Sequence, residues 1–399
     1  MVQTKKQRAL ISGAGIAGLT AAYWLVQIGW DVVVLEKASA LREGEFAIDF
    51  AGTGWDVAIA MGLDNELKKR QLELNTLAFK TNKGVERSRI MMNDFIKLMG
   101  VSDKHVSINR RDLQNLLYEK VEANIDMRFS ASIRSLEEKS NGKSVHVILE
   151  DGTEEEYELV IGADGLHSNV RKLAFGEEDL FAKYLGYYVS AFCVKGSFGN
   201  EPGVMNILRS PNKQAAILDL GDNNSLALLV FASKCEEFVP LEKRKQLLIN
   251  KFGHMGGPIP SILGSIEDDT LIYMDTTTQI KMPKWHSKRV LLIGDAAYCL
   301  TLVSGQGASL AMGGAFFLAK SLESIPPDNI EQALIAYDAR LRPFVNELQN
   351  KAENFASRFI PSSHFGLWLT DRMTSLVNVP IVKGFIEKQF TIKNLFDQD

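Results

Sequence analysis

The sequence has 399 residues, enough for two or three domains that each bury a core, and its 46% hydrophobic and 24% charged residues are ordinary for a folded globular protein. The formal net charge of −4 argues against a nucleic-acid partner and against a polybasic membrane-binding surface. Beyond the N-terminal segment, no uninterrupted apolar run reaches the ~18 residues of a membrane-spanning helix, so no membrane partner is expected.

The first fifty residues predict a strand, a helix and a second strand. Residues 8–12 are short and apolar, residues 16–28 suit a helix, and the β-branched run 31–35 ends at Glu36. The strand and the helix are joined by a GxGxxG motif whose glycines are Gly13, Gly15 and Gly18.

Each part of this motif has a physical role in binding a dinucleotide. The first glycine permits a tight turn, the second lets the backbone approach a pyrophosphate, and the third lets the helix pack on the strand. Glu36 is placed to accept hydrogen bonds from the adenosine ribose. The motif does not distinguish NAD from FAD. A signal peptide is the alternative reading of the charged and apolar N-terminus, but the regular glycines and the second strand argue for a folded unit.

Residues 126–161 predict a three-stranded meander with a turn at Asp151-Gly152 and strands at 145–149 and 157–161. Residues 159–171, LVIGADGLHSNVR, follow. Taken alone, Asp164-Gly165 fits an ordinary turn as well as a functional loop.

The next hundred residues predict an inserted β-rich region. Strand-like runs are separated by Gly, Asn, Asp and Pro clusters, and they cover residues 187–194, 214–220, 226–231 and 270–274. The chain then returns to a buried strand, 290–293, and to the loop GDAAYCLTLVSGQG at 294–307. An apolar helix over 308–322 follows, and residues 328–359 and 364–390 predict two further helical segments.

The glycine motif with Glu36, GADGLHSNVR at 162–171 and GDAAYCLTLVSGQG at 294–307 together resemble the class A FAD monooxygenases, which have the p-hydroxybenzoate hydroxylase fold. Within that family AIDFAG at 47–52 and TTTQIKMPKW at 276–285 are most similar to the tetracycline-inactivating branch, the tetracycline destructases. The resemblance implies an α/β fold. Its parts would be a Rossmann-type FAD-binding domain, an inserted, mainly antiparallel β-sheet substrate domain, and C-terminal helices.

The resemblance also implies domain boundaries and a set of site residues. The FAD-binding domain would comprise 1–70, 98–174 and 284–322, the substrate-binding domain 71–97 and 175–283, and the bridging helices 323–399. The expected cofactor-binding residues are Gly13, Gly15, Gly18, Glu36, Lys37, Arg42, Asp49, Arg110, Asp164, Asp295, Gly305, Gln306 and Gly307. The residues expected near the substrate are Leu302, Gly305, Phe192, Arg209 and Met274.

The implied activity uses FAD, NADPH or NADH, and O2, and places one oxygen atom in a polycyclic aromatic substrate such as a tetracycline. No side-chain acid or base is expected to be catalytic, because the flavin carries the chemistry. Gly305-Gln306-Gly307 opens a helix whose N-terminal N–H groups would favour negative charge on the reduced ring. The six histidines lack metal-binding spacing, so no metal is expected. The three widely separated cysteines fit a reducing compartment, so a cytoplasmic enzyme is expected. A monomer is also expected.

Several alternatives stay open. They are a hydroxylase of simple phenols, an oxidase or halogenase on the same FAD core, and a non-catalytic FAD-binding protein. Leu300 and Leu302 stand where many family members have prolines. Because proline restricts the unfolded chain, we expect a looser loop and a slower or less tightly coupled oxygen transfer.

Overall fold

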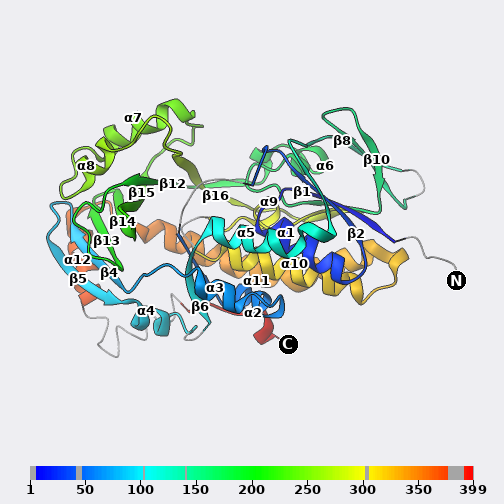
Figure 1. Cartoon of the computed structure of the whole chain (residues 1–399), viewed down its shortest axis with the longest axis horizontal. Helices are drawn as coiled ribbons and strands as arrows, with labels where there is room; N and C mark the ends of the chain where they lie inside the picture. Colours follow the sequence, from blue (N-terminus) through cyan, green and yellow to red (C-terminus); the bar gives the residue numbers. More distant parts are fainter. Residues whose placement is uncertain are drawn as a thin grey trace.

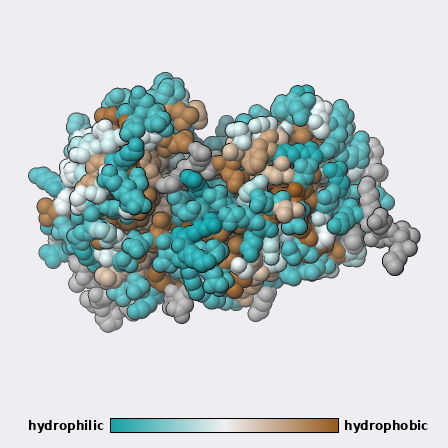
Figure 2. Space-filling model, in the orientation of Figure 1, coloured by the Kyte–Doolittle hydropathy of each residue, from teal (hydrophilic) through white to brown (hydrophobic). Residues whose placement is uncertain are grey.

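The computed structural model describes residues 6–41, 47–101, 104–139, 142–301, 305–375 and 391–398. Two large sheets lie side by side, and the long helix α11 runs beneath both of them (Figure 1). The surface is notched between the part that carries α7 and the part that carries α6 and β8 (Figure 2). The mixed α/β architecture agrees with the fold expected from the sequence.

The first sheet has six strands in the order β17-β18-β11-β1-β2-β7, and all of its neighbours are parallel except β17 and β18. The inner strands are continuous apolar runs, as expected for a parallel sheet covered on both faces. Helix α1 packs against α5 and α10. The elements are β1 Arg8–Ser12, α1 Ile16–Gln27, β2 Asp31–Glu36, α5 Arg110–Val121, β7 Asp126–Phe129, β11 Leu159–Gly162, β17 His286–Ser287, β18 Val290–Leu292 and α10 Gly307–Glu323.

The three-stranded meander expected over 126–161 is shorter in the structure, where it forms a small antiparallel sheet. Its strands are β8 Ile133–Glu138, β9 Val145–Leu149 and β10 Glu154–Tyr157. Residues 126–129 and 159–162 instead join the parallel sheet, the latter pairing with β1. The difference is visible in burial, because β9 alternates between buried and partly exposed residues whereas β11 is buried throughout.

The second large sheet has seven strands in the order β16-β12-β15-β14-β13-β4-β5. All of its pairs are antiparallel except β13 with β4. The strands are β4 Thr76–Thr81, β5 Glu86–Met91, β12 Ala182–Lys195, β13 Val204–Ser210, β14 Lys213–Gly221, β15 Asn224–Ala232 and β16 Tyr273–Ile280. The sequence did not predict β13, and it placed β16 too early, at 270–274. Helices α7 Leu241–Phe252 and α8 Ile259–Gly264 cover one face through an apolar cluster.

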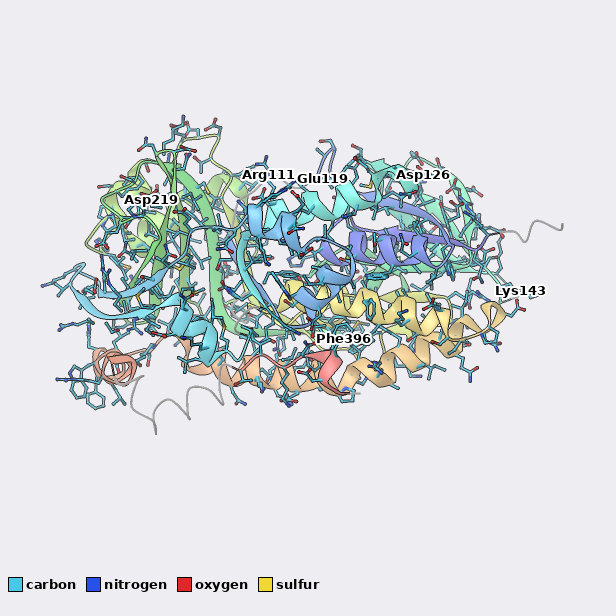
Figure 3. All side chains as sticks on the ribbon, turned by 60° about the horizontal axis from the view of Figure 1, so that its bottom comes forward. Arg111, Glu119, Asp126, Lys143, Asp219 and Phe396 are labelled. Carbon is cyan, nitrogen blue, oxygen red and sulfur yellow. The ribbon has the colours of Figure 1, made fainter. Side chains whose placement is uncertain are left out.

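The long C-terminal helix predicted over 328–359 is confirmed as α11, Ile330–Phe359. It contacts both β12 and β17, so it joins the two large sheets. The segment 364–390 begins with α12, His364–Ser375, and its residues 376–390 lie outside the described part of the chain. Phe396 packs against Phe316 and Phe317 of α10 (Figure 3).

The remaining elements are short. They are β3 Ala47–Ala51, paired with β6 His105–Asn109, and the helices α2 Thr53–Ala60, α3 Asp64–Lys69, α4 Met92–Leu98, α6 Asn169–Ala174 and α9 Asp295–Tyr298. Single 3-10 turns are η1 Glu122–Asn124, η2 Glu178–Leu180, η4 Pro327–Asn329 and η5 Leu395–Gln398. None of the helices in the described ranges is both long and apolar enough to cross a membrane.

Candidate functional site

The turn between β1 and α1 requires glycine at two positions for steric reasons. Gly13 has a φ of +106°, and a Cβ there would lie 2.5 Å from the carbonyl oxygen of Ala163. A Cβ on Gly18 would lie 1.9 Å from the carbonyl oxygen of Gly13. Both glycines are therefore explained by packing of the protein on itself.

Gly15 differs, because the space beside it is open. It precedes the first residue of α1 in an extended conformation, with φ −77°, that any residue can adopt. The nearest atom to a Cβ there would be Nη2 of Arg110, 3.9 Å away. Protein packing therefore does not require this glycine. A ligand phosphate could approach the backbone here, at the positive end of α1, and this space fits the pyrophosphate of a dinucleotide.

Glu36 is tied to the same turn by its carboxylate. One oxygen accepts a hydrogen bond of 3.1 Å from the backbone N–H of Ala14, and the other accepts one of 3.0 Å from that of Ala38. Gln114 of α5 supports the turn by donating to the carbonyl oxygen of Ala14 at 2.8 Å. Since an ionised carboxylate can accept about four hydrogen bonds, Glu36 retains acceptor capacity for a ribose. Lys37, the next residue, is exposed.

Arg110 and Asp295 lie close together beside this turn. Arg110 donates to the side-chain oxygen of Gln114 at 3.3 Å. Burial raises the pKa of Asp295, and the positive charge of Arg110 opposes that rise. Asp295 is nevertheless exposed, so its carboxylate is accessible to a ligand. A Cβ on Gly307 would be 3.9 Å from its Oδ1 atom. The fold therefore gathers Gly15, Arg110, Asp295 and Gly307 from separate segments into one region.

Gly305 and Gln306 complete the loop that enters α10. Gly305 has a φ of +66°, which favours glycine. The carbonyl of Gln306 accepts the hydrogen bond of 3.0 Å from Leu310 that begins the helix. Because Gly307 is the first residue of α10, the N-terminal end of this helix lies next to the carboxylate of Asp295.

Asp164 uses its side chain to hold the start of α6. Its two oxygens accept from the hydroxyl of Ser168, at 2.5 Å, and from the backbone N–H of Val170, at 3.0 Å. Burial raises its pKa. Nearby, the buried Arg171 donates to the carbonyl of Ala296 at 3.0 Å. The segment 162–171 therefore braces both the first glycine turn and the segment that contains Asp295.

Asp49 lies on β3 and takes part in none of these hydrogen bonds. Its Oδ1 atom accepts from the hydroxyl of Ser107 at 2.7 Å and is 3.1 Å from Nε2 of His105. The side chain is 43% exposed, so it can still meet a ligand. Two other expected site residues, Arg42 and Leu302, lie outside the described residues.

Among the residues expected near the substrate, the structure places Phe192 and Met274 apart from Arg209. Phe192 and Met274 are buried in the apolar cluster under α7 and α8. Arg209 shares the opposite face of the sheet with Ile207, two residues before it on β13. Its guanidinium lies 4.7 Å from the ring centre of Phe79.

Two glutamines that the sequence did not single out hold the loop after α9. Gln279 of β16 donates to the carbonyl oxygen of Leu300, and Gln349 of α11 donates to those of Cys299 and Ile280. Leu300 itself is 1% exposed. This part of the loop is therefore fixed by packing and hydrogen bonds. Gln349 lies outside every motif, and Gln279 lies in the segment TTTQIKMPKW, to which the resemblance assigned no role.

His167 lies between two carboxylates. Its Nδ1 atom is 2.9 Å from Glu178 and its Nε2 atom is 3.6 Å from Asp275. Asp275 and Glu178 together raise its pKa to about 10. Asp275 belongs to β16, so His167 links the segment 162–171 to the seven-stranded sheet. Within the described ranges, no group of three or more His, Cys, Asp or Glu side chains is suited to a metal ion.

A family model described as an FAD binding domain matches residues 6–226 and 266–352. A flavin-dependent monooxygenase from an unknown prokaryotic organism is 33% identical over 373 residues, which cover 92% of this chain and 90% of the relative. The chain is also similar to the crystal structures of two tetracycline destructases. Tet(55) has a TM-score of 0.81 and 27% identity, covering 97% of this chain and 98% of that one. Tet(51) has a TM-score of 0.80 and 25% identity, covering 98% and 100%.

Proposed function

The chain belongs to the family with the FAD binding domain and is a flavin-dependent monooxygenase. From that premise we propose that it inactivates tetracycline antibiotics. It would insert one oxygen atom from O2 into the polycyclic substrate, with NADPH, or NADH, as electron donor. The observation that carries the proposal is the likeness, at 25–27% identity over almost the whole chain, to two structures named tetracycline destructases.

The region around Gly15 would hold the cofactor. The open space there fits the pyrophosphate, and Glu36 retains capacity for the ribose. Arg110 and Asp295 would contact the part of FAD that lies between the pyrophosphate and the flavin. When bound, FAD supplies the redox chemistry with NAD(P)H and O2.

The protein's own contribution would be to position the substrate and to exclude water. The buried Leu300 and the glutamines Gln279 and Gln349 would keep the loop after α9 in one conformation beside the reaction. The N-terminal end of α10, at Gly307, would favour the anionic form of the reduced ring. No side chain is required as acid or base.

The proposal includes a division of labour along the chain. Residues 1–70, 98–174 and 284–322 would bind FAD, 71–97 and 175–283 would bind the substrate, and 323–399 would bridge the two. Two observations support it: β4 and β5 join the seven-stranded sheet, and α11 contacts both large sheets. We also propose that the enzyme acts as a monomer in the cytoplasm. Size-exclusion chromatography tests whether it is a monomer.

The test uses the purified FAD-loaded enzyme with NADPH, O2 and a tetracycline. We expect NADPH oxidation that the tetracycline stimulates, together with loss of absorbance by the tetracycline chromophore. Unchanged tetracycline absorbance would refute the tetracycline proposal. NADPH oxidation that simple phenols stimulate instead would indicate a phenol hydroxylase. No stimulation by any aromatic compound would indicate an FAD-binding protein without this activity.

A further inference from the structure

A cavity lies at the outer end of the seven-stranded sheet, between α12 and the strands β4, β5 and β13. It has a volume of about 420 Å³. Helix α12 lies at the end of the molecule opposite Asp126 and Lys143 of the FAD-binding part (Figure 3). Neither Gly15 nor Asp295 is among the residues that line the cavity. It is therefore separate from the candidate cofactor site.

The lining of this cavity is strongly cationic. Lys80, Arg87, Arg209 and Arg372 all line it, and no acidic side chain does so among the described residues. The nearest acid on β5 is Glu86, the cross-strand partner of Lys80, and its carboxylate forms hydrogen bonds of 3.0 Å to Arg89. A concave surface with charges of one sign raises the local concentration of ligands of the opposite sign. The ligand expected here is an anion.

Two of the cationic groups lie near aromatic rings. Arg209 is 8% exposed and its guanidinium lies over the ring of Phe79, so it forms a fixed inner part of the cavity. Arg372 lies 5.7 Å from the ring centre of Trp368. Trp368 is 52% exposed, and the buried Leu367 lies beside it. Trp368 also stacks on Phe365, with 5.9 Å between the ring centres. A flat ring would therefore meet the edge of Trp368 and Leu367 while its charged group meets the arginines.

We propose that this cavity is a second ligand site, which binds a small aromatic anion. The ring packs against Trp368 and Leu367, and the anionic group contacts Arg87 and Arg372 at the mouth and faces Arg209 inside. The volume is within the range of small-molecule sites. Binding here requires no redox chemistry, so the proposal is independent of the reaction at the flavin.

The test uses the full-length, FAD-loaded protein and three probes: benzoate, its uncharged analogue benzamide, and inorganic phosphate. Tryptophan fluorescence and calorimetry follow binding, and the flavin absorbance spectrum is recorded in parallel. We expect benzoate to change the tryptophan fluorescence with saturation, and the Trp368→Phe variant to lose this change. The Arg87→Gln/Arg372→Gln variant should bind benzoate about tenfold more weakly, because two charge-assisted contacts are lost. Benzamide and phosphate should both bind more weakly than benzoate.

Both arginines are exposed, so their replacement should leave the fold intact. Arg134→Gln is the matched control, because Arg134 is also exposed but lies on β8 of the small sheet. Three results would overturn the proposal. These are equal affinity for benzoate and benzamide, unchanged affinity in the double variant, and a flavin spectrum that changes with the same concentration dependence as the tryptophan signal. Phosphate binding as tight as benzoate would refute the aromatic part.

Discussion

The side-chain amide of Gln279 donates a hydrogen bond of 3.0 Å to the backbone carbonyl of Leu300 and one of 2.9 Å to that of Gln349. The side chain of Gln349 in turn donates a hydrogen bond of 2.7 Å to the carbonyl of Ile280 and one of 3.2 Å to that of Cys299. These two buried amides join β16, α11 and the loop after α9. The position of the loop is therefore set by residues from other segments of the chain.

Replacing Gln279 or Gln349 with leucine should loosen this loop. Each change removes a buried amide that donates to backbone carbonyl groups, at a cost of about 1–3 kcal/mol. We expect a lower free energy of unfolding and, if the proposed reaction holds, more hydrogen peroxide released per NADPH oxidised. Denaturation and a peroxide assay measure the two effects. Gln246→Leu, at an exposed helix position, is the control, and equal effects of all three variants would contradict the prediction.

The two leucines of this loop should respond differently to proline. The backbone of Cys299, with φ −46° and ψ 127°, already has the conformation that a following proline requires, so Leu300→Pro should be tolerated. Thr301 has a φ of +122°, which a proline at 302 would disfavour. We therefore expect Leu302→Pro to lower the melting temperature more than Leu300→Pro does. If the prolines instead stabilise equally, by about 0.4–1 kcal/mol each, this argument fails.

Alanine at Gly15 and at Gly18 should separate cofactor binding from folding. At Gly18 the new Cβ would be 1.9 Å from a backbone oxygen, so the FAD-free protein itself should lose stability. At Gly15 the nearest atom would be 3.9 Å away, so the FAD-free protein should keep its melting temperature. FAD affinity should still fall, by about tenfold or more, because the methyl group occupies the space for the pyrophosphate. Thermal unfolding with and without FAD, together with FAD titration, distinguishes the two outcomes. Full FAD affinity in Gly15→Ala would contradict the assignment of this space.

His167 should make the stability depend on pH. Its pKa is raised from 6.5 to about 10, first by Asp275 and then by Glu178. The protonated form is thus favoured by folding, so the stabilisation is complete below pH 6.5 and is lost as the pH rises through about 10. The melting temperature of the native protein should exceed that of His167→Gln at pH 6, and the difference should shrink toward pH 10. A difference that stays constant over this range would show that the ion pairs do not matter. The side chain is 65% exposed, so the effect should also weaken with salt.

The features that the sequence predicted are those fixed locally. Gly13 has a positive φ that favours glycine, Gly18 packs on Gly13, and Glu36 ends the strand β2, so one short segment contains the whole signal. Asp295 likewise sits one residue after Gly294, whose φ of +60° a glycine favours. The family resemblance then connected these segments in the right order.

The features that were missed depend on contacts between distant segments. Alternation within a strand shows which residues share a face of the sheet, but not which face packs against the helices. Phe192 and Arg209 were therefore expected in one site, although they lie on opposite faces. Residues 159–161 read equally well as part of a hairpin, and only pairing with β1 places them in the parallel sheet. The roles of Gln279 and Gln349 exist only once α11 has packed against β16.

The strand order of the six-stranded sheet also affects how the chain can fold while it is being synthesised. β11, at Leu159–Gly162, is an inner strand whose second neighbour is β18, at Val290–Leu292. A ribosome that adds 5–20 residues per second needs roughly 15–60 s to reach β18. Until then one edge of β11 has no partner, while every strand of the seven-stranded sheet has already been made. We therefore expect the inserted sheet to be able to close first on the nascent chain, and the FAD-binding sheet to be the part that depends on chaperones when translation is slow.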